Sequence, residues 1–185
     1  MRKTLCAMLA LCVMACGKSE ETRAPEPAPQ VSVTREPEFS FNADQFAHAF
    51  NAASKTFGQS YRIHKVEIKH GAVHDYFEHK FTHDVSLTVG VSKETGHILN
   101  ITALVAGNGD ASDNRHALMA ISEVVTAASD TNMSKEKASK LVSDMLKEAG
   151  QPHESGQFPQ RFINHVRYVL RSGSSIGSWW IASPA

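Results

Sequence analysis

The clearest local pattern in this sequence is Phe77-Glu78-His79-Lys80-Phe81-Thr82-His83-Asp84-Val85-Ser86-Leu87-Thr88-Val89-Gly90-Val91. Its odd positions are apolar or histidine, and its even positions are charged, polar or glycine. Side chains of a β-strand alternate between the two faces of the sheet. The alternation over these 15 residues therefore predicts one long strand with a single buried face.

The residues that follow predict a hairpin. Glu94-Thr95-Gly96 suits a three-residue loop with Gly96 in the left-handed conformation. An apolar side chain then faces an apolar or small one across the pair, so the register is self-consistent. The expected pairs are Lys93–His97, Val91–Leu99, Val89–Ile101, Leu87–Ala103 and Val85–Val105.

Apolar residues at helical spacing predict three helices, at 42–57, 114–128 and 135–149. The first carries Phe46, Phe50 and Phe57 on one stripe, which is typical of core packing. Further strands are expected at 61–69, 161–171 and 176–182. The order α-β-β-β-α-α-β-β predicts a single α+β domain at 39–185, with an antiparallel sheet packed by helices.

The first 16 residues have the layout of an export signal. Arg2 and Lys3 precede an apolar stretch of 12 residues, which is shorter than the about 20 that a membrane span needs. A small residue, Ala15, then precedes Cys16. An ordinary export signal with Cys16 as a bystander, or a buried N-terminal helix, are the alternatives.

This start resembles the signal of bacterial lipoproteins, with Val13-Met14-Ala15-Cys16 as the lipobox. The resemblance implies that the signal peptide 1–15 is removed and that Cys16 carries the lipid that anchors the protein to a membrane. Gly17 in place of Asp implies the outer membrane, facing the periplasm, if the host is Gram-negative. Residues 16–38 then form a proline-rich, disordered tether.

Composition narrows the classes of partner. Without Arg2 and Lys3, the 19 basic residues fall to 17, against 19 acidic ones. No cluster of Lys or Arg is present in the sequence, so no nucleic-acid partner is expected. The cysteines are Cys6, Cys12 and Cys16, so the domain itself contains neither a thiol nor a disulfide.

Four histidines, His70, His74, His79 and His83, predict a zinc site as an alternative function. Neutral imidazole is a good zinc ligand. On a strand, however, His79 and His83 would lie about 13 Å apart, which is too far for one ion. Scattered histidines without a metal are the other interpretation, and the expected cofactor is none.

Gly173-Ser174-Ser175-Ile176-Gly177 matches the G-x-S-x-G pattern of a nucleophile elbow. That mechanism needs a following helix and a later acid and histidine. Only eight residues follow Gly177, and they include no His, Asp or Glu. The pattern therefore predicts a hairpin turn, and no catalytic residue is assigned. A hydrolase whose groups converge from distant positions stays open as a further alternative.

Trp179 and Trp180 are adjacent, so on a strand their rings point to opposite faces. One can fill the core while the other contacts a partner, and both are candidate partner-binding residues. The leading hypothesis is a membrane-anchored, non-catalytic envelope lipoprotein that binds an envelope or secreted protein.

Overall fold

The computed structural model describes residues 35–107, 110–151, 157–173 and 177–185. Residues Arg35–Ala185 form one compact unit. The predicted export signal, Cys16 and most of the predicted tether lie outside the described residues. No helix in the described part of the chain combines the length and hydropathy of a membrane span.

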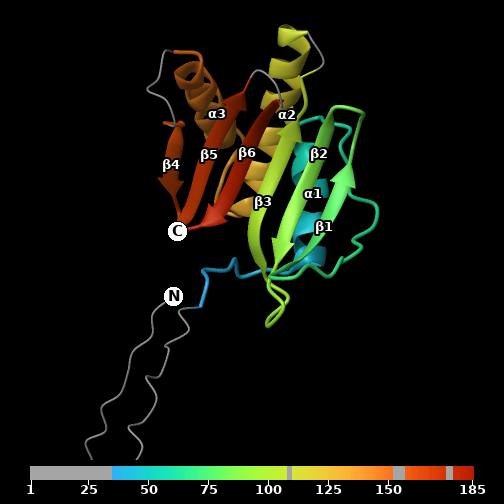
Figure 1. Cartoon of the computed structure of the whole chain (residues 1–185). Helices are drawn as coiled ribbons and strands as arrows, with labels where there is room; N and C mark the ends of the chain where they lie inside the picture. The colour runs from blue at the N-terminus through green and yellow to red at the C-terminus, as the bar shows by residue number, and fades with distance from the viewer. Residues whose placement is uncertain (1–34, 108–109, 152–156, 174–176) are drawn as a thin grey trace, which may run out of the picture. The chain divides into compact units, whose positions relative to one another are not determined.

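Six strands form one antiparallel sheet in the order β1-β2-β3-β6-β5-β4. The three helices lie together on one face of it, and Figure 1 looks onto the opposite face. The elements are α1 (Ala43–Thr56), β1 (Asp75–Lys80), β2 (Val85–Val91), β3 (Ile98–Val105), α2 (Ala111–Ser129), α3 (Lys135–Ala149), β4 (Gln160–Ile163), β5 (Val166–Gly173) and β6 (Gly177–Pro184). The predicted α+β class, with an antiparallel sheet packed by helices, is confirmed.

Each half of the sheet is a helix followed by a three-stranded meander. α1 precedes β1, β2 and β3, and α3 precedes β4, β5 and β6. The last strands of the two meanders, β3 and β6, pair antiparallel at the centre of the sheet. α2 packs on both of these strands and on the other two helices, so it joins the two halves into one core.

The stretch 77–91 is two strands rather than the predicted one. β1 ends at Lys80 and β2 begins at Val85. The hydroxyl of Thr82 accepts hydrogen bonds from the backbone N–H groups of Asp84 (3.2 Å) and Val85 (3.0 Å), which stabilises the turn. Alternation cannot reveal this turn, because β1 pairs odd residues with odd residues and the pattern continues across it.

The β2–β3 register agrees with the prediction at Val85–Val105, Leu87–Ala103 and Val89–Ile101. Beyond Gly90 the pairing shifts by one residue, so Val91 lies opposite Ile98 instead of Leu99. The backbone N–H of Ser92 then donates to the carbonyl of His97 (2.8 Å), so the predicted Lys93–His97 pair is wrong. Gly96 is left-handed as predicted, with φ +73°.

The segment 61–69 is not the predicted strand. The side-chain amide of Asn51 binds both backbone groups of Ile63, at 2.8 and 2.9 Å, so this segment is held against α1. Only Lys69 forms a β-bridge, with Tyr76.

The predicted strand 161–171 is the hairpin β4–β5. Its turn is Asn164-His165, with φ of 49° and 66°. Two consecutive positive φ angles are what a tight two-residue hairpin requires. The element order therefore gains a strand and becomes α-β-β-β-α-α-β-β-β.

Two of the helix starts agree with the prediction. Asn42 and Gln45 form a capping box at the start of α1, and Ser134 caps α3. α2 begins before the predicted residue 114, because the Asp110 carboxylate accepts from the N–H groups of Ser112 and Asp113.

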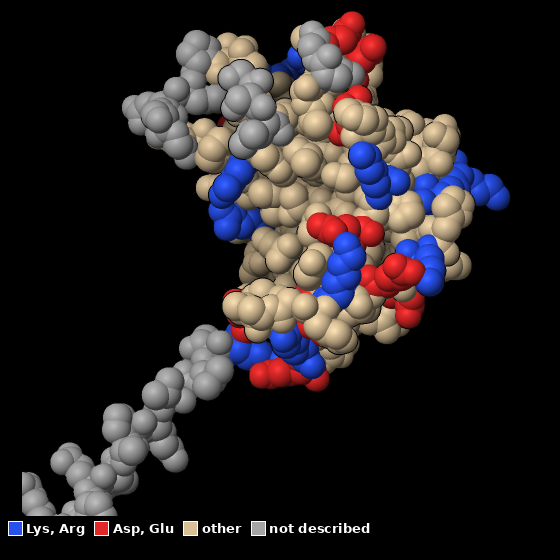
Figure 2. Space-filling model, turned by 45° about the vertical axis from the view of Figure 1, so that its right-hand side comes forward, with Lys and Arg blue, Asp and Glu red and all other residues tan. Residues whose placement is uncertain are grey.

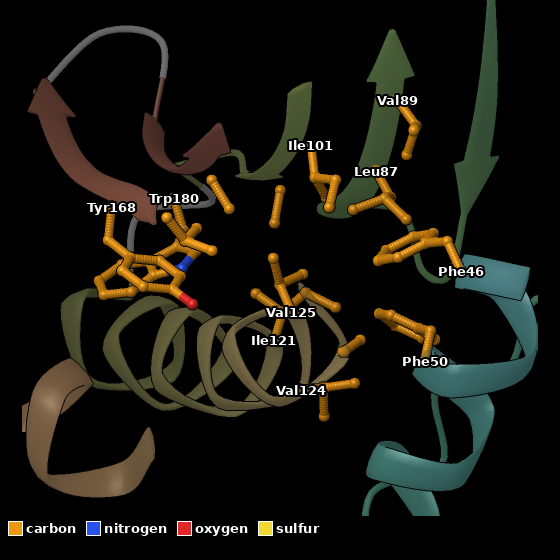
Figure 3. Packing of buried hydrophobic residues seen from close by; sticks show 14 of the residues in the cluster. Phe46, Phe50, Leu87, Val89, Ile101, Ile121, Val124, Val125, Tyr168 and Trp180 are labelled. Carbon is orange, nitrogen blue, oxygen red and sulfur yellow. The ribbon is translucent and has the colours of Figure 1, made fainter. Parts of the chain in front are cut away.

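The core lies between the helices and the sheet (Figure 3). The predicted stripe on α1 is part of it, since Phe46 and Phe50 are both fully buried. α2 contributes a second apolar row that faces the central strands. The labelled side chains are Phe46, Phe50, Leu87, Val89, Ile101, Ile121, Val124, Val125, Tyr168 and Trp180.

Candidate functional site

The side of the sheet that faces away from the helices is uncovered by any described helix (Figure 1). Alternation places every second residue of each strand on this side, the open face. Cross-strand pairing aligns these residues in rows. The central row is Glu78–Thr88–Thr102–Ile181–Val169–Gln160, and the row beside it is Lys80–Ser86–Leu104–Trp179–Arg171.

The middle of the open face carries no charge. Its charged side chains belong to β1 on one side and to β5 on the other. Figure 2 shows uncharged side chains across much of this surface, with the charged ones mainly around them. The open-face residues of β2, β3 and β6 are Ser86, Thr88, Gly90, Asn100, Thr102, Leu104, Trp179, Ile181 and Ser183.

The tryptophan pair is divided between the two faces, as predicted. Trp179 lies half-buried on the open face, between Leu104 and Arg171. Trp180 is fully buried under the helices, and its ring centroid lies 6.0 Å from that of Tyr168. Trp180 is therefore a core residue and cannot contact a partner, whereas Trp179 stays a candidate.

A hollow of about 420 Å³ lies at the β5 side of the open face. The guanidinium of Arg171 lies 5.2 Å from the centre of the Phe158 ring, and that of Arg167 lies 6.0 Å from the centre of the Phe162 ring. Arg167 also donates to the side-chain oxygen of Gln160, from Nε (3.3 Å) and Nη2 (3.1 Å). The hollow is lined by Gln157, Phe158, Gln160, Arg167, Val169 and Arg171.

The four candidate metal ligands lie in separate places. Three contact different carboxylates: His70–Asp75 at 3.0 Å, His74–Glu36 at 3.3 Å and His83–Asp84 at 2.7 Å. His79 packs instead on the rings of Phe81 and His64, and burial lowers its pKa. In the part of the chain that the structure describes, no group of three or more His, Cys, Asp or Glu side chains could hold one metal ion.

The G-x-S-x-G match lies between two strands. Gly173 pairs with Gly177 at the end of the β5–β6 hairpin, and β6 follows, so the required helix is absent there. Residues 174–176 are outside the described part of the chain. A cavity of about 350 Å³ adjoins these glycines, and its described lining contains Arg115 but no histidine or carboxylate.

His116 and Glu123 both line another shallow hollow, on α2. They lie seven residues apart, which is about 10 Å along a helix. This hollow therefore lacks the close His–carboxylate pair that general acid–base catalysis would use.

Comparison with protein-family models, with curated proteins and with solved structures finds no match to this chain.

The sequence motifs do not single out four residues of the hollow and its rim, which are Arg167, Arg171, Phe158 and Phe162. Composition could have indicated them, because residues 155–185 include three arginines but no Asp or Glu.

Proposed function

We propose that this chain is a membrane-anchored, non-catalytic envelope lipoprotein whose domain binds another protein through the open face. The observation that carries the proposal is the uncharged centre of this face, with Trp179 half-buried between Leu104 and Arg171. Exposed apolar patches bordered by polar side chains mark interaction sites, and Leu104, Trp179 and Ile181 adjoin one another within this face.

The composition of the face supports a protein partner. Tryptophan and arginine are enriched at the centres of protein interfaces, whereas lysine, aspartate and glutamate are depleted there. Six strands span about 24 Å, so the face can supply much of the roughly 800 Å² that one partner contributes to a standard interface. The rows of Ser and Thr provide hydroxyls for polar contacts without the desolvation cost of a charge.

The membrane anchor is supported by the lipobox resemblance at Cys16. Its test is Cys16→Ser in the full chain, with the protein followed through fractionation of the native host's cells. We expect the wild type in the membrane fraction and the variant released or retained as an uncleaved precursor. If the variant is processed and sediments with membranes as wild type does, the anchoring proposal is wrong.

Site-specific photo-crosslinking in the native host tests the binding surface. A photoreactive amino acid replaces Thr88 or Thr102 on the open face, and Lys137 or His116 on exposed helix positions in matched controls. We expect a discrete protein adduct from the open-face positions and none from the helix positions. Adducts from the helices alone, or equal adducts from both sides, would contradict the proposal.

A further inference from the structure

Two arginines of β5 face the open side of the sheet. Arg167 and Arg171 are four residues apart on one strand, so their Cα atoms lie about 13 Å apart on the same face. Arg167 donates to the neutral amide of Gln160, and Arg171 lies over the ring of Phe158. Among the described residues, neither guanidinium forms an ion pair.

Two other arginines of the described chain are neutralised by ion pairs. Arg35 pairs with Glu38, and Arg161 pairs with Glu148 on α3. Across the sheet, Lys69 pairs with Glu78 of β1 at 2.7 Å. Among the described residues, the β5 side therefore presents two guanidiniums without an ion pair, and residues 155–185 contain no Asp or Glu.

Aromatic and apolar neighbours shape the space between the two guanidiniums. Val169 lies between the arginines in the strand and is only 7% exposed, so it forms an apolar floor. Phe158 and Phe162 are 41% and 63% exposed and lie against the guanidiniums. Stacking on a ring holds a guanidinium in place while its edge can still donate to a planar anion. In Arg167, where Gln160 accepts from Nε and Nη2, the donors that remain are the N–H groups of Nη1 and the second N–H of Nη2.

We propose that this hollow binds an extended acidic segment of the partner protein, with two carboxylates about four residues apart contacting Arg167 and Arg171. This inference rests on the proposed function of the open face and names the chemistry of its partner. Arginine forms bidentate hydrogen bonds with carboxylates. An extended segment matches the spacing, because residues i and i+4 of a strand are also about 13 Å apart.

An anionic lipid surface fits these observations less well. Membrane-binding patches contain clusters of about four to eight Lys or Arg side chains. Here two arginines flank a single hollow of about 420 Å³, which opens beside the uncharged surface around Trp179. Two cations at a fixed spacing beside an uncharged surface match a polypeptide with two acidic side chains better than they match a membrane surface with many anionic headgroups.

The test is selection from a random 12-residue peptide library with the full chain as bait. Sequences that also bind Arg167→Gln/Arg171→Gln are removed by counter-selection. We expect the selected peptides to share Asp or Glu at i and i+4. A selection without acidic peptides, or with no enrichment at all, overturns the inference.

Affinities of the best selected peptide then test the contacts. We expect Arg167→Gln/Arg171→Gln to weaken binding at least about tenfold, as does replacing the two peptide acids with their amides. Arg167→Lys/Arg171→Lys should recover only part of the affinity, because lysine lacks the bidentate fork. Arg115→Gln/Lys137→Gln removes the same charge from the helices and should leave the affinity unchanged. Equal weakening by this control would overturn the inference.

Two further measurements separate the alternatives. The wild type could bind phosphatidylglycerol vesicles more tightly than the peptide and lose this binding in Arg167→Gln/Arg171→Gln. That result would assign the hollow to lipid and overturn the inference.

The photo-crosslinked adduct of Thr102 is also compared between wild type and this double variant. If the adduct persists undiminished, the inference fails while the proposed function stands; if no open-face adduct forms in wild type, the proposed function fails first. Circular dichroism confirms that each variant is folded.

Discussion

Arg171 lies directly opposite Trp179 in the β5–β6 pair, on the face that no described helix covers. Such cross-strand partners have Cβ atoms about 5 Å apart, so the cation and the indole belong to one surface. The next residue, Trp180, lies opposite Leu170 and under the helices. A single step along β6 therefore separates a surface residue from a core residue.

The two tryptophans should differ sharply in their contribution to stability. Trp180→Ala removes a fully buried side chain, and we expect it to lower the free energy of unfolding by about 3–5 kcal/mol. Trp179→Ala removes a half-buried side chain and should cost about 1 kcal/mol. Urea denaturation followed by circular dichroism measures both. Equal losses would show that Trp179 is a core residue and would remove it from the binding surface.

Gly177 should not tolerate a side chain. Its φ is +97°, and a Cβ there would lie 2.2 Å from the backbone oxygen of Val105. We expect Gly177→Ala to destabilise the fold by about 1–3 kcal/mol, because both the strain and the clash involve backbone that cannot move freely. Gly107→Ala is the matched control, since a Cβ at that position has no atom within 4 Å. Thermal melting of the two variants compares them, and similar melting temperatures would contradict the β3–β6 packing.

Tyr168 links the sheet to α2 through its hydroxyl, which lies 3.3 Å from that of Ser129. Burial raises the pKa of Tyr168 well above its ordinary value of about 10. The folded state therefore binds this proton more tightly than the unfolded state, and stability falls as the pH rises above about 10.

We expect the loss of stability between pH 9 and 11 to be smaller in Tyr168→Phe than in wild type, although the variant loses about 1 kcal/mol at neutral pH with its hydrogen bond. Urea midpoints across this range measure the difference. Parallel curves for the two proteins would show that the tyrosine ionises as freely in the folded state as in the unfolded chain.

Glu38 should make stability depend on pH in the opposite sense, because its contribution to stability is lost in acid. The Thr95 hydroxyl donates to its carboxylate at 2.7 Å, and this hydrogen bond, with the charge of Arg35, lowers the pKa of Glu38. A lowered pKa contributes stability above the ordinary value of about 4.3, which is lost as the pH falls through the lowered pKa. We therefore expect Glu38→Gln to be less stable than wild type near neutral pH.

The difference in stability between wild type and Glu38→Gln should disappear in strong acid, where Glu38 of the wild type is protonated and therefore uncharged. Denaturation of the two proteins from pH 2 to pH 7 measures it. Glu94→Gln is the control, because Glu94 is an exposed carboxylate next to Thr95 in the turn between β2 and β3. A gap that is constant with pH would mean that the substitution acts through packing alone.

Local chemistry determined most helix boundaries. Asn42 and Gln45 form the capping box of α1, and Ser134 caps α3, because short polar side chains satisfy the free N–H groups of a first turn. The start of α2 was misplaced because Asp110, Ser112 and Asp113 are all suitable caps. Which of several adjacent polar residues accepts the hydrogen bonds depends on where the preceding strand ends.

Turns inside alternating stretches were not predictable in the same way. Thr82 and Asn164-His165 reverse the chain without glycine or proline at the turning point, so the alternation 77–91 and the stretch 161–171 each read as one strand. The strand predicted at 61–69 was wrong for another reason. The side chain of Asn51, twelve residues away, forms the hydrogen bonds with the backbone of Ile63 that a neighbouring strand would otherwise form.

The alternation in the sequence is enough to predict which residues share a face, because the twofold period of a strand holds whatever the strand pairs with. It showed that Trp179 and Trp180 point in opposite directions, and it paired Val89 with Ile101. The face that the helices cover, and therefore the tryptophan that stays accessible, follow from the packing of the helices on the sheet. The tertiary structure also brought Arg167 and Arg171 beside Phe162 and Phe158, because that neighbourhood depends on how β4 and the residues before it return onto β5, a contact between segments that no local pattern encodes.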